Sequence, residues 1–158
     1  MPVALNQKDI AILRLLQQDA SLTSTAIAEH LGLSQSPCWR RINHIEQEGL
    51  IRQRVALLDR EKLGIALVVF ATINLTAHDR ARIEHFESAV RLCPEVIECY
   101  TMTGTWDYML KIVAHDLPHY ESFMREHLLA IPGVREMHSH IAVTEIKNTT
   151  ELPLDTQL

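Results

Sequence analysis

Residues 24–43 constrain the fold more than any other stretch, because they fit two short helices joined by a tight turn. Thr23 can cap the first helix, and Gly32 stands where the chain must turn sharply with a positive φ. Ser34 can cap the second helix, and Pro37 falls within its first turn, where a missing N–H costs little. This pattern predicts a helix-turn-helix, which places its second helix in the major groove of DNA.

The second of these helices has two distinct faces. Cys38, Ile42 and Ile45 recur at i, i+4 and i+7, so this stripe is expected to face a core. The other face carries hydroxyl, amide and guanidinium groups, which can bond base edges and phosphates. The predicted DNA-binding residues are this face and the arginines near it: Ser34, Gln35, Ser36, Trp39, Arg40, Arg41, Asn43, Arg52 and Arg54.

The neighbouring segments favour a complete DNA-binding domain over a plain helical hairpin in an all-α core. A helix of period 3.6 precedes the motif, with Ile10, Leu13 and Leu16 on its apolar side and Asn6 as its cap. Residues 49–59 follow, and they are typical of a helix stop and then a short strand. Three helices and a small strand predict a winged helix-turn-helix domain over residues 1–60.

The charge is unevenly distributed along the chain. Residues 1–60 hold seven Lys/Arg and six Asp/Glu, whereas residues 61–158 hold eight and fourteen. A small basic footprint on an acidic body fits a protein that docks at a defined place on double-stranded DNA. It argues against a protein that coats nucleic acid.

The sequence also predicts the compartment. The first residues lack the basic and apolar regions of a signal peptide, and the longest apolar run, residues 65–71, is far too short to span a bilayer. The three cysteines are odd in number and have no zinc-like spacing, which suits a reducing environment. We therefore expect a cytoplasmic protein with no membrane contact.

The second half has a different pattern, which follows a predicted hinge at residues 61–65. Strands are expected over residues 66–75, 96–103, 108–114 and 134–146. Helices are expected over residues 79–92 and 117–131. The order β-α-β-β-α-β predicts an α+β, ferredoxin-like effector and oligomerisation domain over residues 66–158.

The expected sheet is apolar on both faces. In the first strand Val69 and Ala71 alternate with Val68 and Phe70. The two helices can cover only one face, so the other face needs a cover of its own. The simplest cover is a second copy of the chain, which predicts a two-fold homodimer.

Eight segments in order resemble the Lrp/AsnC (leucine-responsive/asparagine-operon, or feast/famine) family of regulators. They are residues 5–13, 28–34, 37–42, 46–51, 56–64, 103–108, 131–134 and 146–154. Together they extend over nearly the whole chain. The family usually has Asp where this chain has Asn6, and either residue caps a helix.

The resemblance implies a transcription factor whose dimers often assemble into octamers. It also implies a small amino acid as effector, bound in the second domain where dimers meet. Asp107 can accept from the ammonium of such a ligand, and backbone N–H groups near Gly104 can donate to its carboxylate. The predicted effector-binding residues are Thr101, Thr103, Gly104, Thr105, Trp106, Asp107 and Ser139.

Other functions have weaker support in the sequence. A thiol- or metal-responsive sensor would use Cys99 or histidines such as His138 and His140, but no recognised ligand spacing accompanies them. An amino-acid-binding subunit that controls an enzyme is a third hypothesis, and the basic cluster speaks against it. Asp107 and Glu136 lack a nucleophile or phosphate loop beside them, so we predict no catalytic residues, no metal site and no cofactor.

Overall fold

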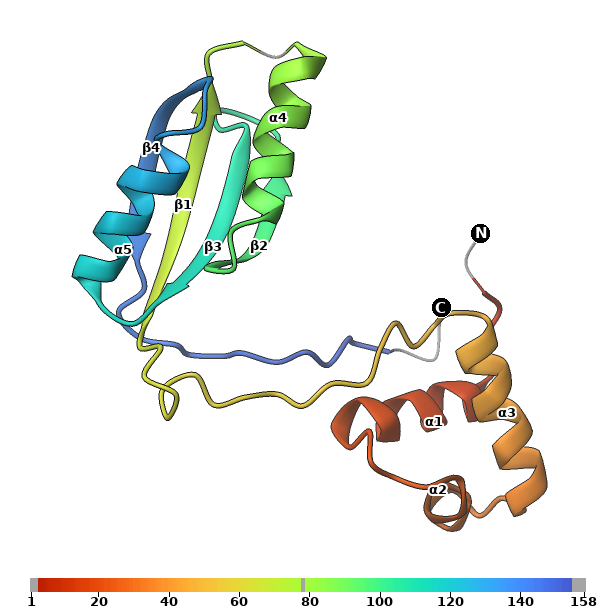
Figure 1. Ribbon diagram of the computed structural model, residues 1–158. Helices are drawn as coiled ribbons and strands as arrows, with labels where there is room; N and C mark the ends of the chain where they lie inside the picture. Colours follow the sequence, from red (N-terminus) through yellow and green to blue (C-terminus); the bar gives the residue numbers. More distant parts are fainter. Residues whose placement is uncertain (1–2, 78, 155–158) are drawn as a thin grey trace. The chain divides into compact units, whose positions relative to one another are not determined.

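The computed structural model describes residues 3–77 and 79–154, which form two compact units (Figure 1). The first unit comprises the chain up to Leu57 together with the tail from Lys147, and the second comprises Leu58–Ile146. These limits differ from the predicted domain boundaries, which stay a prediction. The tail from Lys147 lies in the same unit as the helix-turn-helix, and the change of unit precedes the predicted hinge.

Three helices build the first unit: α1 Gln7–Gln18, α2 Ser24–Leu31 and α3 Gln35–Gln47. The predicted cap of α1 is confirmed, since the Asn6 side chain accepts from the backbone N–H of Lys8 and Asp9. The Asp9 carboxylate in turn accepts from the Asn6 N–H at 3.2 Å, which completes a capping box.

The turn between α2 and α3 also follows the prediction, with one exception. Thr23 accepts from the N–H of Ala26 at 3.2 Å, and Gly32 adopts φ 61°. Ser34 occupies the N-cap position of α3, but its side chain makes no capping hydrogen bond. Cys38, with Ile42 and Ile45, is buried in the core of this unit as expected, and the Cys38 N–H donates to the Ser34 carbonyl at 3.2 Å.

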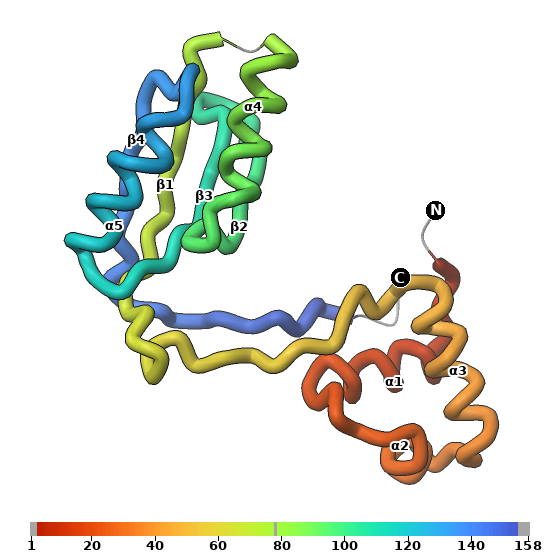
Figure 2. The backbone as a smooth tube through the Cα atoms, in the orientation of Figure 1, coloured from red at the N-terminus to blue at the C-terminus, as the bar shows by residue number. Residues whose placement is uncertain are grey.

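The short strand expected after α3 does not form in the single chain. Residues 52–58 are extended without secondary structure (Figure 2). A strand requires a partner strand for its backbone groups, and the described residues supply none here. The apolar side chains of Val55 and Leu57 are accordingly exposed.

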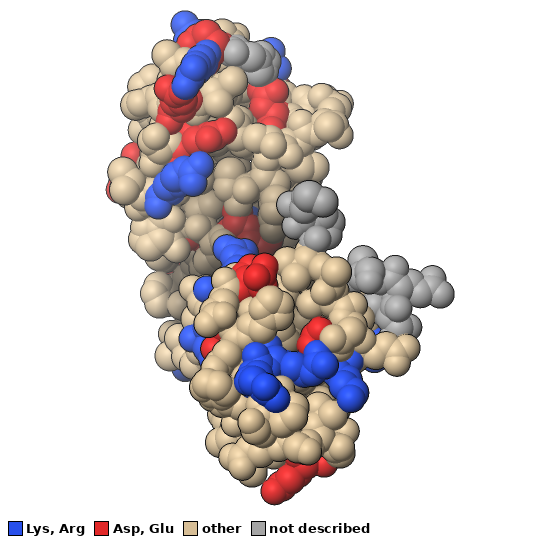
Figure 3. Space-filling view, turned by 90° about the vertical axis from the view of Figure 1, so that its right-hand side faces the viewer, with Lys and Arg blue, Asp and Glu red and all other residues tan. Residues whose placement is uncertain are grey.

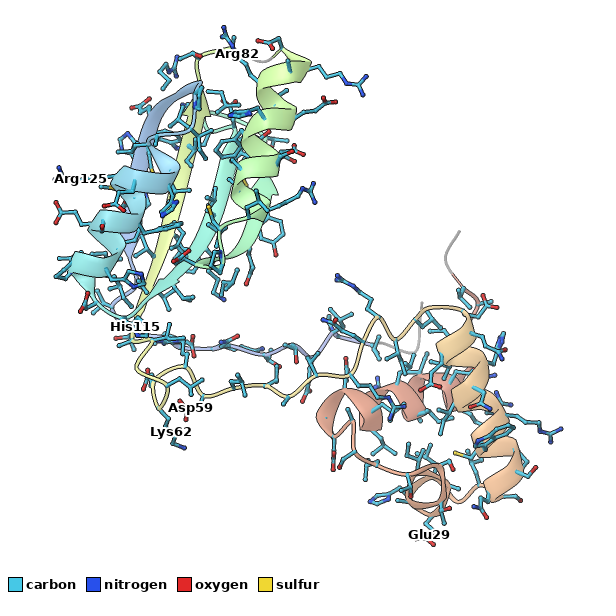
Figure 4. All side chains as sticks on the ribbon, viewed as in Figure 1. Glu29, Asp59, Lys62, Arg82, His115 and Arg125 are labelled. Carbon is cyan, nitrogen blue, oxygen red and sulfur yellow. The ribbon has the colours of Figure 1, made fainter. Side chains whose placement is uncertain are left out.

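Residues 61–65, which are predicted as a hinge, lie in a hydrogen-bonded turn of the second unit. The N–H of Ile65 donates to the Arg60 carbonyl at 2.8 Å, and the Arg60 guanidinium donates to the carbonyls of Ile65 and Ala66. The Nδ1 atom of His115 lies 2.9 Å from the Gly64 carbonyl oxygen. Figure 4 labels His115 close to the turn that carries Asp59 and Lys62. These bonds fix the turn to the sheet domain. Residues 52–57, which come before the turn, form no helix or strand.

The second unit has the predicted ferredoxin-like order. Its elements are β1 Leu67–Leu75, α4 Arg80–Arg91, β2 Val96–Thr101, β3 Tyr108–Ala114, α5 Leu117–Phe123, the π-helical turn η1 Met124–Leu128, and β4 Val134–Ile141. The strands form one antiparallel sheet in the order β2-β3-β1-β4. Both helices lie on one face of it (Figure 1).

The last strand and the last helix are shorter than predicted. β4 was expected to reach residue 146, but it ends at Ile141 because its partner β1 begins only at Leu67. The final backbone bond of this ladder joins the N–H of Ala142 to the Val68 carbonyl at 2.9 Å. The helix expected to reach residue 131 ends with η1 at Leu128, ahead of the Pro-Gly turn.

The tail after β4 docks on α1 in the first unit. The Gln17 side-chain amide donates to the Leu152 carbonyl and accepts from the Leu152 N–H, both at 3.0 Å. The Arg14 guanidinium donates to the Leu154 carbonyl. Sequence periodicity could not predict that the tail docks on α1, because the tail forms neither helix nor strand.

Candidate functional sites

The outward face of α3 presents most of the predicted DNA-binding residues to solvent. Ser34, Gln35 and Ser36 are exposed at the start of the helix, and the Gln35 amide donates to the Thr25 hydroxyl at 2.8 Å. Trp39 is 54% exposed, a large fraction for so apolar a side chain. Exposed Arg40 and half-buried Asn43 complete the set on the helix.

Arg41 lies on the same helix but has an internal partner. Its guanidinium donates to the Asp9 carboxylate at 2.8 Å, and that carboxylate is nearly buried. The pair links α3 to the capping box of α1. The structure therefore gives Arg41 a positioning role that the exposed Arg40 lacks.

The two arginines after α3 also differ from each other. Arg54 is held by the Ala20 carbonyl at 2.9 Å and by the Glu46 carboxylate at 2.8 Å. Arg52 is exposed. Figure 3 shows Lys and Arg side chains gathered on the helix-turn-helix part of the face turned to the viewer. Such a cluster can contact phosphates, which carry most of the affinity for DNA.

The carboxylate of Asp107, the predicted partner of an effector ammonium, is already engaged within the chain. It accepts from the backbone N–H of Leu75 at 2.8 Å. The Asp107 N–H donates to the side-chain oxygen of Asn74 at 3.0 Å, and Asn74 is buried. These bonds tie the start of β3 to the end of β1, so Asp107 helps to close the sheet.

We call residues 102–107 the β2–β3 hairpin turn. Its middle is exposed. Thr103, Gly104 and Thr105 are exposed, and Gly104 takes φ 105°, which favours glycine. The Trp106 ring packs on His138 of β4, with ring centroids 4.6 Å apart. His138 in turn lies 2.9 Å from the Glu136 carboxylate, and this hydrogen bond lowers the Glu136 pKa.

Ser139 and the hairpin turn make separate contacts. The Ser139 hydroxyl lies 2.6 Å from the Tyr120 hydroxyl of α5, on the face of the sheet that the helices cover. The hairpin turn makes its contacts with the end of β1 and with β4. Within one chain, the predicted effector residues therefore do not form a single site: Ser139 lies apart from the hairpin turn.

Thr101 lines a cavity that the sequence analysis missed, between α4 and β2. Its volume is about 380 Å³, and we call it the α4–β2 pocket. Its other lining residues are Glu87, Val90, Arg91, Cys99, Tyr100 and Tyr108. A sequence signal for it did exist: the Glu87/Arg91 pair is spaced i, i+4 on a helix, and Cys99 and Thr101 alternate on one side of a strand.

Within residues 3–77 and 79–154, no three His, Cys, Asp or Glu side chains are grouped so that they could hold a metal ion. None of the helices in the described part of the chain has the length and apolar character needed to cross a bilayer.

Family matches extend over most of each unit. Residues 5–52 match a winged helix-turn-helix DNA-binding family, and residues 68–152 match the Lrp/AsnC ligand binding domain. The chain is 37% identical over 155 residues to the transcriptional regulator AzlB of Bacillus subtilis, with 98% of this chain and 99% of that protein covered.

Two solved structures are similar over the same extent. One is an AsnC family regulator of Agrobacterium tumefaciens, with TM-score 0.93 and 41% identity over 98% of this chain and all of that one (100%). The other is the transcriptional regulator NMB0573 of Neisseria meningitidis in complex with L-Met, with TM-score 0.94, 36% identity and the same coverage of 98% and 100%.

A helix-turn-helix with an exposed polar recognition helix, joined to a ligand-binding domain, defines a DNA-binding transcriptional regulator. Such regulators are not enzymes, and their ligand serves to control DNA binding. The chain belongs to the Lrp/AsnC family, as its two family matches and its relatives show.

Proposed function

We propose that this regulator binds a specific double-stranded DNA sequence in the cytoplasm and that a small amino acid changes its affinity for that site. The observation that carries the proposal is the outward face of α3. Trp39 and Arg40 are exposed there, while Cys38 and Ile42 anchor the helix in the core. A rigid helix with exposed donors is suited to reading base edges.

Amino-acid binding is supported by the second unit and by a relative. Residues 68–152 match a ligand-binding domain, and the Neisseria meningitidis regulator was crystallised with L-Met. Amino acids share an ammonium and a carboxylate, so a site that holds one needs acceptors and donors close together. The second unit carries both kinds of group beside a cavity, in Glu87 and Arg91.

Dimerisation is supported by the face of the sheet that the helices leave uncovered. Phe70 is 38% exposed there, with Val68 on the same face, and its cross-strand partners are Lys111 and His140. The Thr72 hydroxyl is buried on this face and has no hydrogen-bond partner in the described chain. We propose that a second copy covers this face, and that such dimers assemble further, up to octamers.

The DNA-binding part is tested by fluorescence anisotropy with a labelled promoter fragment over a series of salt concentrations. Affinity should fall steeply and linearly on a log–log plot, because each phosphate contact releases a counterion. Each of the twenty amino acids is then titrated at fixed salt. A flat salt dependence, or an unchanged affinity with every amino acid, would overturn the corresponding half of the proposal.

The dimer is tested by sedimentation velocity of Phe70→Asp beside a matched control. A charge in the middle of a buried interface should dissociate the protein into monomers, because the carboxylate cannot be hydrated there. Leu92→Asp is the control, since Leu92 is 84% exposed at the end of α4 and away from this face. If both variants sediment like the wild type, the uncovered face is not the interface.

A further inference from the structure

Trp39 is the one large apolar side chain exposed to solvent on α1, α2 and α3, three helices that the structure describes completely. Its exposed fraction is 54%, whereas the preceding residue, Cys38, is fully buried. The backbone of α3 is thus anchored in the core directly beside the exposed indole. Single apolar side chains are common on protein surfaces, so the meaning of this one depends on what its position faces.

The position of Trp39 is in the first half of α3, the part of a recognition helix that reaches base edges in the major groove. Residues three or four apart are neighbours on a helix surface, so Trp39 has Ser36 on one side along the helix and Asn43 on the other. The Gln35 amide, one turn before Trp39, donates to the Thr25 hydroxyl at 2.8 Å and ties the start of α3 to α2. The indole is therefore an apolar group among polar neighbours on a firmly held turn.

The major groove offers only one apolar group to such a side chain, the 5-methyl group of thymine. The other groups on the base edges are nitrogen and oxygen acceptors and the amino groups of adenine and cytosine. An indole has one N–H donor and no acceptor, so it cannot pair with an amino group. Thymine matches the Trp39 ring in two ways, because its methyl group packs against the apolar surface and its O4 atom can accept from the N–H.

Arg40 follows Trp39 on the helix and differs from it in chemistry. Its guanidinium is exposed and charged, so it gains affinity from phosphates or from the acceptors of guanine. Neither of these contacts involves a methyl group. Trp39 carries no charge, so it adds nothing to the attraction of phosphates and acts by contact alone. The contributions of these adjacent residues can therefore be separated by changing the DNA.

We propose that Trp39 is a specificity-determining residue, and that its indole contacts the 5-methyl group of a thymine in the major groove. The contact favours thymine over the other three bases at one base pair of the sequence that each α3 reads. The inference rests on the proposed function, in which α3 reads a specific duplex. It adds the residue that discriminates and the chemical group on the DNA that it recognises.

The first test removes the methyl group from the DNA. The wild-type chain selects a duplex from a random-sequence pool, and the duplex is then synthesised with uracil in place of each thymine in turn. Uracil differs from thymine only by the missing methyl group. Fluorescence anisotropy at fixed salt should show a roughly fourfold loss of affinity at the contacted position, as expected for one methyl group that is no longer buried. Uracil outside the selected sequence should have no effect.

Three variants assign the effect to a side chain. Trp39→Gln lacks the aromatic ring and should bind the thymine and uracil duplexes with equal affinity. Trp39→Phe keeps an apolar ring without the N–H donor, so it should still prefer thymine. Arg40→Ala is the matched control on the adjacent residue. It should weaken binding to both duplexes by the same factor and keep the wild-type preference for thymine.

The second test follows the indole itself by tryptophan fluorescence with acrylamide as the quencher. The chain has two tryptophans, Trp39 in α3 and Trp106 in the second unit. Added duplex should protect the wild type from quenching, because the exposed ring of Trp39 becomes covered. Trp39→Phe is the reference, since only Trp106 emits there. Its quenching should be the same with and without the duplex.

The outcomes separate this inference from the proposed function. If uracil is tolerated at every position, or if Trp39→Gln prefers thymine as strongly as the wild type, the thymine contact is overturned while specific DNA binding stands. If that variant keeps the preference but sediments differently, Trp39 contacts another copy of the chain instead. If the wild type selects no common sequence from the pool, this inference and the proposed sequence-specific binding are both wrong.

Discussion

The outward face of α3 and the β2–β3 hairpin turn were both predicted as contact surfaces, and the structure treats them differently. On α3 the side chains of Gln35, Trp39 and Arg40 are exposed. In the hairpin turn the Asp107 carboxylate is bonded to the Leu75 N–H, and Trp106 packs on His138. The helix face is open to a partner, whereas part of the hairpin turn is engaged by neighbouring strands.

The difference follows from the range of the interactions that orient each group. On a helix, position in the sequence determines direction, so a buried stripe implies an opposite exposed face. In a hairpin, direction depends on the register of strands that are distant in sequence. Asp107 meets Leu75 only because β3 pairs with β1. A contact surface on a helix is therefore easier to predict than one on a turn.

The largest effect is expected on the α3 side. Arg40→Ala should weaken DNA binding by about 2 kcal/mol, roughly thirtyfold, because an exposed guanidinium on a recognition helix contacts bases or phosphates. Anisotropy at fixed salt measures this loss. Arg80→Ala is the control, since Arg80 is an exposed arginine of α4 in the other unit. Equal affinity of wild type and Arg40→Ala would mean that the DNA does not lie along this face.

An effect of similar size is expected on the hairpin side, and it concerns stability rather than DNA binding. Asp107→Ala should lower the free energy of unfolding by about 2 kcal/mol, because it leaves the Leu75 N–H without its acceptor. Asp107→Asn keeps an oxygen for that bond and should be nearly as stable as the wild type. Urea unfolding measures both variants.

The variants Asp107→Ala and Asp107→Asn also test whether the charge of Asp107 takes part in the amino-acid response. If the carboxylate also contacts the effector, Asp107→Asn should lose the amino-acid response while keeping its stability. A full response in Asp107→Asn would restrict Asp107 to its structural role and leave the effector site to other residues.

Arg41 provides a comparison within α3 itself. Arg41→Ala should lower the free energy of unfolding by about 1 kcal/mol, because it removes the partner of the nearly buried Asp9 carboxylate. Arg40→Ala should leave stability unchanged, since the exposed Arg40 has no comparable internal role. Thermal unfolding of the two variants side by side decides this. Equal melting temperatures would indicate that the Arg41–Asp9 pair adds no net stability.

The smallest effect concerns the helix caps. Thr23→Ala should cost about 1 kcal/mol of stability, because the Thr23 hydroxyl accepts from the Ala26 N–H. Ser34→Ala should cost less than about 0.5 kcal/mol, because Ser34 makes no such bond. Chemical denaturation measures the free energy of unfolding of both variants. A loss for Ser34→Ala as large as that for Thr23→Ala would show that the Ser34 cap forms in solution.

The amino-acid sequence by itself determined the helix-turn-helix, the β-α-β-β-α-β order and the family. These rest on local signals: the Asn6 and Thr23 caps, the positive φ at Gly32, and the apolar stripe through Cys38 and Ile42. Each signal acts over one or two turns or along one strand, so it can be recognised without knowing what lies across the fold.

Only the tertiary structure decided which of the predicted site residues are open to a ligand. Arg41 contacts Asp9, Asp107 contacts Leu75, and Ser139 contacts Tyr120. The partners in each pair are far apart in the sequence, so a helix or strand periodicity cannot predict them. The docking of the tail on α1 and the α4–β2 pocket were likewise visible only in the structure. These features depend on strand register and on the packing of α4 over β2, which arise only when segments far apart in the sequence come together.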